Sequence, residues 1–154
     1  MAHTVVTRTV SPQLICAARR RVRVPEIASA WKPALDEVWA FLARYPGLRA
    51  PDGHNLFLYH HSTRPNEPMD IDFGVQVTRA FLGEDGVSMT ATPAGEVAST
   101  VHIGPYSGLG PAHSAIHHWA AANKRRIGAA SWEIYGDWND DPTKLETEIV
   151  YLLA

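Results

Sequence analysis

The chain has 154 residues, of which 45% are hydrophobic and 19% are charged, and its formal net charge is −2. This size and apolar share are typical of one globular domain over residues 1–154, and they exclude a disordered tail or a fibrous repeat. Nucleic-acid-binding proteins normally carry a basic balance, so we expect no direct binding of DNA or RNA. No apolar run approaches the roughly 20 residues that a membrane span needs, so we expect no membrane association.

The single cysteine, Cys16, cannot form an internal disulfide bond. The N-terminal residues lack the basic and apolar segments that together make a signal peptide. Both observations predict a cytoplasmic location.

The first half of the chain predicts two strands, a helix and two further strands. Residues 3–24 are rich in Val, Ile, Thr and Arg and are broken by Ser11-Pro12, which indicates two extended segments around a turn. Apolar residues then recur three or four apart and predict one face of a helix: Ile27, Trp31, Leu35, Val38, Trp39 and Leu42. We expect Ser29 to cap this helix and Pro33 to lie near its first turn. Strands are expected over 55–61 and 70–78.

The second half repeats this order after a turn at residues 83–86. Strands are expected over 87–92 and 96–103, followed by a helix that opens at Gly110-Pro111 with proline in its first position. Its inner face is expected to carry Ala112, Ile116, Trp119 and Ala120. Two more strands complete the chain, the first over 131–137.

Matching residues support an internal duplication. Pro25 and Trp39 recur as Pro105 and Trp119, each pair being offset by eighty, and Tyr59 recurs as Tyr135. The sequence therefore predicts an α+β fold of two strand-helix-strand-strand units, about residues 3–80 and 86–153. Such a duplication implies pseudo-twofold symmetry with a central cleft between the units.

Glu133 is the residue most suited to chemistry in that cleft. Strand alternation places Trp132 and Ile134 on one face and Ser131, Glu133 and Tyr135 on the other. If Trp132 and Ile134 pack toward the helices, Glu133 points into the space between the repeats. Phe57 holds the equivalent position in the first half. An acid beside aromatic rings can hold an organic cation or act as a general base, whereas the simplest alternative is a solvated strand glutamate.

The histidines of the second helix do not form a recognisable metal site. His113 and His117 lie four residues apart and could share one ion, but no glutamate follows His113 as zinc proteases require, and no further ligand is identifiable. We therefore interpret these histidines as a surface helix face, and expect neither a metal nor another cofactor.

Several segments resemble the GyrI-like small-molecule-binding family, which includes the effector-binding domains of AraC-type and MerR-type regulators and their stand-alone relatives. The similar segments are Leu56 to His60, Asp70 to Gly74, Thr92 to Leu109, Trp119, Trp132 to Tyr135 and Glu146 to Ile149. The resemblance covers nearly the whole chain. It implies an antiparallel sheet with two main helices and a groove between the halves.

The resemblance also implies a site and a function. The family's groove acid aligns with Glu133, and the aromatic groove residues of relatives suggest Phe57, Tyr59, Tyr106 and Tyr135. The sequence contains no helix-turn-helix segment, so we expect a stand-alone protein that binds small hydrophobic, often cationic compounds.

Two alternatives stay open. A cofactor-independent hydrolase would use Glu133 to activate water against electrophilic metabolites that carry a cyclopropane ring. A gyrase-inhibitor-like role would require a protein partner, and the sequence does not settle whether the chain forms a homodimer.

Overall fold

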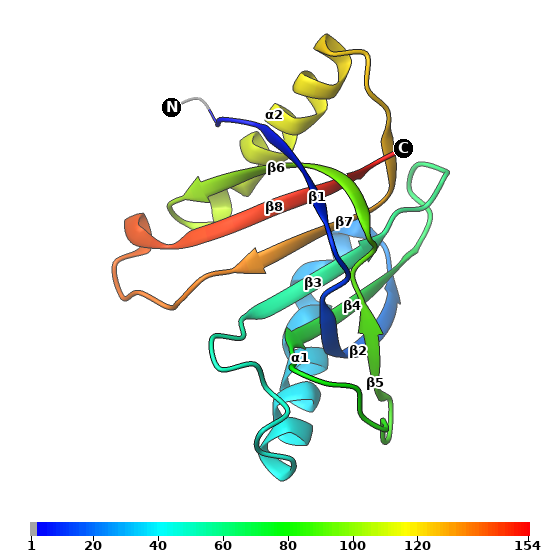
Figure 1. Ribbon diagram of the computed structural model, residues 1–154, viewed down its shortest axis with the longest axis vertical. Helices are drawn as coiled ribbons and strands as arrows, with labels where there is room; N and C mark the ends of the chain where they lie inside the picture. Colours follow the sequence, from blue (N-terminus) through cyan, green and yellow to red (C-terminus); the bar gives the residue numbers. More distant parts are fainter. Residues whose placement is uncertain (1–2) are drawn as a thin grey trace.

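The computed structural model describes residues 3–154, whose strands form one antiparallel sheet with two long helices (Figure 1). In chain order the elements are β1 (Val6–Val10), β2 (Leu14–Val22), α1 (Ile27–Arg44), β3 (Asn55–His60), β4 (Met69–Gln76), β5 (Val87–Ala91), β6 (Gly95–Ile103), α2 (Leu109–Ala122), β7 (Ile127–Tyr135) and β8 (Glu146–Leu153). A 3-10 turn precedes each long helix, Val24–Glu26 before α1 and Tyr106–Gly108 before α2. The predicted α+β class and order of elements are confirmed.

The order of strands in the sheet reflects the two halves of the chain. It runs β1-β6-β8-β7-β3-β4-β2-β5. Exchanging β1–β4 with β5–β8 gives the same order read backwards, so each half occupies equivalent places in the sheet. The two halves meet at the pairing of β3 with β7.

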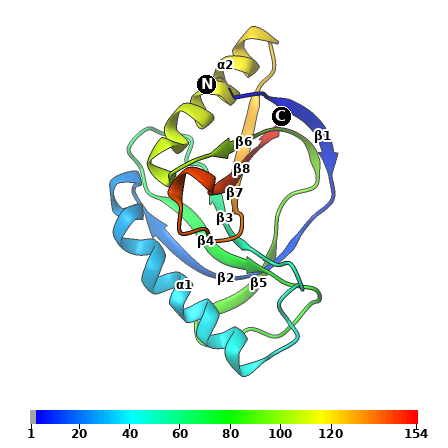
Figure 2. The ribbon, with the colours of Figure 1, turned by 90° about the vertical axis from the view of Figure 1, so that its left-hand side faces the viewer.

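Both helices pack on the same face of the sheet, one over each half (Figure 2). Under α1 lies a cluster that includes Val38 and Phe41 of the helix with Phe73 and Val75 of β4. Under α2 lies a smaller cluster that includes Ile116 of the helix and Ile149 of β8. The predicted inner face of α2 is confirmed, because Ala112, Ile116 and Ala120 are buried and Trp119 packs partly against the same cluster.

The opposite face of the sheet has its own apolar core. That core joins Ile15 of β2 with Val97 of β6, although these strands stand near opposite ends of the strand order. The sheet therefore curls until its far face closes on itself, and the curvature is visible in Figure 2. Trp132 belongs to this core and Ile134 packs against it, so the condition that these two residues pack toward the helices is not met. Glu133 instead lies on the side that carries α1 and α2.

The helix starts also differ from the prediction. Ser29 lies inside α1, and its hydroxyl donates to the carbonyl of Glu26, so Ser29 is not the N-cap. The 3-10 turn at Val24–Glu26 leads directly into α1, which moves the start upstream and leaves Pro33 inside the helix. The same reason places Pro111 third in α2, because Tyr106–Gly108 leads directly into Leu109.

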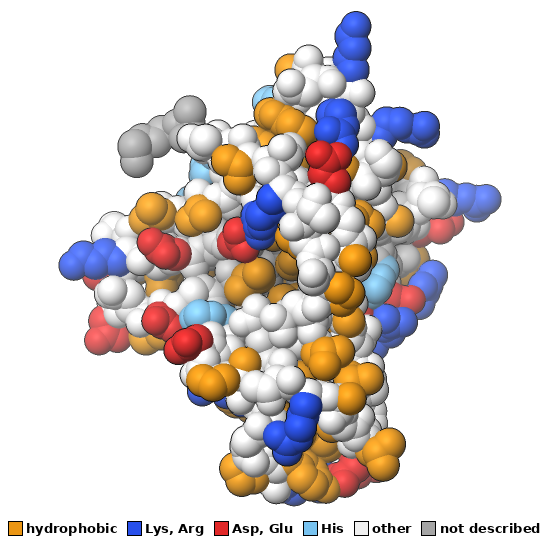
Figure 3. Space-filling model, viewed as in Figure 1, with side chains coloured by type: hydrophobic (Ala, Val, Ile, Leu, Met, Phe, Trp, Pro, Cys, Tyr) orange, Lys and Arg blue, Asp and Glu red, His pale blue; other side chains and the backbone are white. Residues whose placement is uncertain are grey.

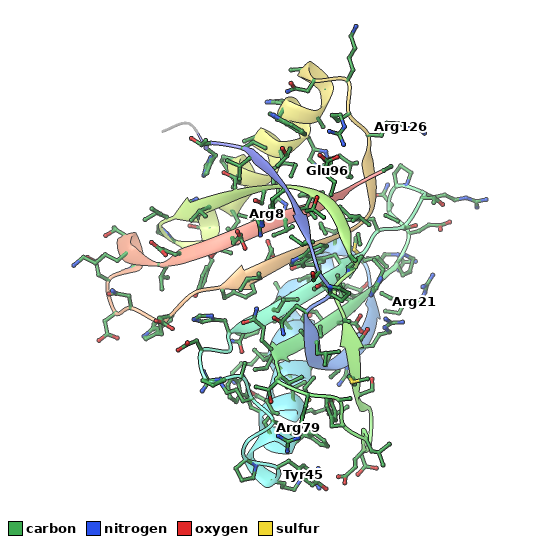
Figure 4. All side chains as sticks on the ribbon, viewed as in Figure 1. Arg8, Arg21, Tyr45, Arg79, Glu96 and Arg126 are labelled. Atoms are coloured by element: carbon green, nitrogen blue, oxygen red, sulfur yellow. The ribbon has the colours of Figure 1, made fainter. Side chains whose placement is uncertain are left out.

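Polar contacts at the surface hold the short edge strand β1 in place. Arg8 of β1, labelled in Figure 4, points out from this strand. It donates to Ser99 of β6 and lies 3.3 Å from a carboxylate oxygen of Glu148 in β8. Basic and acidic side chains are interspersed over the face drawn in Figure 3. Within residues 3–154, neither helix combines the length and hydropathy needed to cross a bilayer.

Candidate functional site

The candidate site forms where the two halves of the sheet meet. Phe57 of β3 and Glu133 of β7 are direct partners in the antiparallel register of the central strand pair. Both side chains are buried, and that of Glu133 is only 7% exposed. An unpaired carboxylate would be costly at such a position, so its hydrogen-bond partners decide what the site can do.

Three donors bind the Glu133 carboxylate. The hydroxyls of Tyr59 and Tyr135 both donate to Oε1, each over 2.6 Å. On the other side, Nε2 of His113 in α2 lies 2.8 Å from Oε2. A carboxylate has about four acceptor positions, so most of its capacity is used inside the protein.

These bonds determine the charge of the site. Burial alone would raise the pKa of Glu133, but the hydrogen bonds from His113, Tyr135 and Tyr59 outweigh it, and the net shift is downward. Burial and the neighbouring carboxylate raise the pKa of Tyr59 and that of Tyr135 well above their ordinary value. Glu133 is therefore an anion at neutral pH, and both tyrosines are neutral hydrogen-bond donors.

An aromatic cavity of about 350 Å³ opens in front of the two tyrosines, between α1 and the start of α2. Its lining residues are Ile27, Trp31, Leu35, Asn55, Phe57, Tyr59, Tyr106, Leu109, Tyr135 and Trp138. The ring of Tyr135 contacts Phe57 and Tyr106 edge to face, with centroid distances of 4.8 and 5.6 Å. Among these described lining residues none is charged, so the cavity is mainly apolar and its polar groups are all neutral.

The structure brings four of the five expected site residues into this cavity: Phe57, Tyr59, Tyr106 and Tyr135. Tyr106 is 40% exposed and lies at the rim. Glu133 is not part of the lining. It lies one hydrogen bond behind it, linked through the hydroxyls of Tyr59 and Tyr135.

His113 belongs to the site, which the sequence reasoning missed. Its Nε2 meets Glu133, and its Nδ1 lies 2.8 Å from the hydroxyl of Tyr151. The interpretation of His113 as a surface residue is wrong because α2 lies over β6 and β8 and turns this position toward Glu133 of the neighbouring strand β7. Its spacing to the buried Ala112, Ile116 and Ala120 was the available signal, since a residue flanking the inner face of a helix can reach the sheet.

Further polar side chains extend from His113 away from the cavity. Tyr151 faces Ser131 in the strand register, and Nε2 of His61 lies 2.6 Å from the Ser131 hydroxyl. Burial raises the pKa of Tyr151 to about 12. Burial lowers the pKa of His61, helped by the nearby His117 and His113. In residues 3–154, no three His, Cys, Asp or Glu side chains come together in an arrangement suited to a metal ion.

Solved structures of other proteins share this fold. The C-terminal domain of EcmrR is 20% identical, with a TM-score of 0.82 over 100% of this chain and 99% of that chain. SAV2435 bound to tetraphenylphosphonium is 13% identical, with a TM-score of 0.74 over 100% of this chain and 94% of that chain. A hydrolase from Listeria innocua is 13% identical, with a TM-score of 0.66 over 99% of this chain and 93% of that chain.

Comparison with curated protein sequences gives no match. The model of the GyrI-like small molecule binding domain, in contrast, matches residues 3–153. This match covers almost all of the described chain, including both helices and every strand. The chain therefore belongs to the GyrI-like family of small-molecule-binding domains.

Proposed function

We propose that this protein binds hydrophobic organic cations in the aromatic cavity, with Glu133 as the counter-charge behind the cavity wall. The observation that carries the proposal is the pair of 2.6 Å hydrogen bonds from Tyr59 and Tyr135 to one oxygen of Glu133. Each hydroxyl donates its hydrogen bond to the carboxylate, so the lone pairs of the hydroxyl oxygen remain available to the cavity. The wall therefore presents electron-rich oxygens and ring faces, which favour a cation.

The lack of a charged group in the lining decides which cations fit. A small, strongly hydrated cation would lose its water and gain no direct ion pair, which is unfavourable. A large cation with delocalised charge loses less hydration and gains contact with Trp31, Phe57 and Tyr106. Tetraphenylphosphonium, the compound bound to SAV2435 in its solved structure, is a cation of this kind.

The binding test compares tetraphenylphosphonium with the neutral triphenylphosphine oxide, by calorimetry, on the parent protein and on Glu133→Gln. We expect the parent to prefer the cation. Glu133→Gln should weaken binding of the cation by about 1–3 kcal/mol, which is the range for losing a charge-assisted contact. Binding of the neutral compound should stay nearly unchanged. Circular dichroism of the variant checks that it folds.

A parallel experiment on the same two proteins separates binding from hydrolysis. A cyclopropane-bearing electrophile is incubated with each protein, and mass spectrometry follows the gain of one water molecule by the electrophile. Water addition by the parent that is slowed about a hundredfold or more in Glu133→Gln would assign a hydrolase instead. The lowered pKa of Glu133 argues against that outcome, because a weakly basic carboxylate abstracts a proton poorly. Equal binding of both ligands by the parent protein would overturn the proposal.

A further inference from the structure

We propose that His113 sets the charge preference of the cavity, so that affinity for cations rises when His113 loses its proton. The inference rests on the proposed function, because it concerns how Glu133 acts on a cation. It follows from the position of His113 on the side of Glu133 opposite to the cavity.

The geometry makes His113 and Glu133 one electrostatic unit. Nε2 of His113 lies 2.8 Å from Oε2, while the two tyrosines occupy Oε1. The side chain of Glu133 is 7% exposed and that of His113 is 27% exposed, so water screens their interaction only weakly. Because an imidazole can be neutral or protonated, the hydrogen-bonded pair of His113 and Glu133 has two charge states.

The two states differ in the field that a ligand meets. With a protonated His113 the pair is neutral overall, and a cation in the cavity gains little from Glu133. With a neutral His113, the imidazole still donates Nε2–H to Glu133 and accepts from the Tyr151 hydroxyl at Nδ1. The hydrogen bonds are then all kept, and the site carries a net negative charge.

Other titratable groups also lie near His113. From β7 it faces Glu133, which stays ionised above pH 5 because its pKa is lowered. From β8 it faces Tyr151, whose pKa is about 12, so that group stays protonated. His61 follows β3 and adds charge only in acid, since its pKa is lowered. On α2 itself, His117 has a lowered pKa and contacts the ring of Tyr151 rather than Glu133.

The experiment measures affinity for tetraphenylphosphonium and for triphenylphosphine oxide between pH 5.5 and 8.5, a range in which neither probe titrates. For the parent protein we expect affinity for the cation to rise on the order of tenfold with pH, while the neutral probe stays constant. His113→Gln keeps a donor toward Glu133 but cannot take up charge. It should bind the cation at the high-pH level throughout.

The matched control is His118→Gln, which removes an exposed histidine from the same helix and should keep the parent's pH profile. The pH titration of the parent tests the inference even if His113→Gln fails to fold. A flat cation profile in the parent, with Glu133→Gln still weakening the cation, would overturn the role of His113 and leave the proposed function standing. Equal binding of both probes at every pH, unaffected by Glu133→Gln, would overturn both.

Discussion

Phe57 and Glu133 face each other across the central strand pair, one from each half of the chain. Phe57 lines the cavity, and Glu133 lies behind two tyrosines that complete the same wall. This pairing places an apolar surface and a buried charge at the same level of the sheet.

Removing the hydroxyl of Tyr59 or Tyr135 should destabilise the protein. Tyr59→Phe and Tyr135→Phe each take one donor from the buried Glu133, a loss of about 1–3 kcal/mol in the free energy of unfolding. Urea denaturation followed by fluorescence measures it. The control is Tyr45→Phe, whose hydroxyl contacts Glu84 at the exposed end of α1, and it should change stability by less than about 0.5 kcal/mol. Equal effects at all three positions would contradict the prediction.

The rim of the cavity should contribute to affinity without contributing much to folding. Trp31 is 39% exposed and its ring centroid lies 6.3 Å from that of Phe57. Trp31→Ala should weaken binding of tetraphenylphosphonium by about 0.5–2 kcal/mol, which is the range for the contact of a cation with an aromatic face. Calorimetric titration gives the value. Leu82→Ala, at a 92% exposed position outside the cavity, serves as the control and should bind as the parent does.

Acid should destabilise the protein through two buried carboxylates. The pKa of Glu133 is lowered by its donors, and that of Asp72 is lowered by Arg19 and His60, in both cases against the effect of burial. Their ordinary values are 4.5 and 3.8, so the stability they contribute is present above these values and is lost as the pH falls through the lower folded pKa. Denaturation midpoints between pH 3 and 7 test this. Asp72→Asn should lower the free energy of unfolding at pH 7 and make it depend less on pH in the acid range. An unchanged dependence on pH would contradict this role of Asp72.

The two halves should unfold together. The central pair β3–β7 joins them into one sheet, and the core on its far face takes residues from both. A single transition is expected, with the same urea midpoint by tryptophan fluorescence and by far-ultraviolet circular dichroism. Two separated transitions would show that each half is a unit of its own.

The purified protein should hold no stoichiometric zinc. His113 is engaged by Glu133 and Tyr151, and His117 contacts the ring of Tyr151 edge to face. Zinc sites in proteins normally use three or four protein ligands. Elemental analysis should therefore find far less than one zinc per chain. About one zinc per chain that disappears in His117→Ala would overturn this prediction.

Much of the fold could be predicted because its pattern is local. The periodic apolar residues of α1 and the alternation in β4 follow directly from helix and strand geometry, and Ile71, Phe73 and Val75 do share a buried face. The sequence could not predict which residues of β7 face the helices. Periodicity tells which residues share a face but not which face meets the helices, and here Trp132 and Glu133 are both buried because the sheet curls around a second core.

The candidate site, too, could be predicted only in part. The resemblance to a family suggested Phe57, Tyr59, Tyr106 and Tyr135, which line the cavity, and it aligned Glu133 with the family's groove acid. It did not suggest Trp31 or Trp138, which line the same cavity. The contact between His113 and Glu133 joins residues twenty apart, because α2 packs on β6 and β8 and its His113 side chain reaches the neighbouring strand β7. No spacing rule gives that distance, because it depends on how the helix is rotated about its axis.

Joining the two halves in one chain has a chemical consequence at the centre of the sheet. Two separate copies of a single unit would have to place the same side chain on both sides of the β3–β7 pairing. Two glutamates there would repel one another, and one would take up a proton, whereas two phenylalanines would leave no charge. A covalently linked pair escapes that constraint, so one half supplies Phe57 and the other Glu133. An acid that faces an aromatic side chain at this strand pair is therefore available to this chain and not to a symmetric pair of identical units.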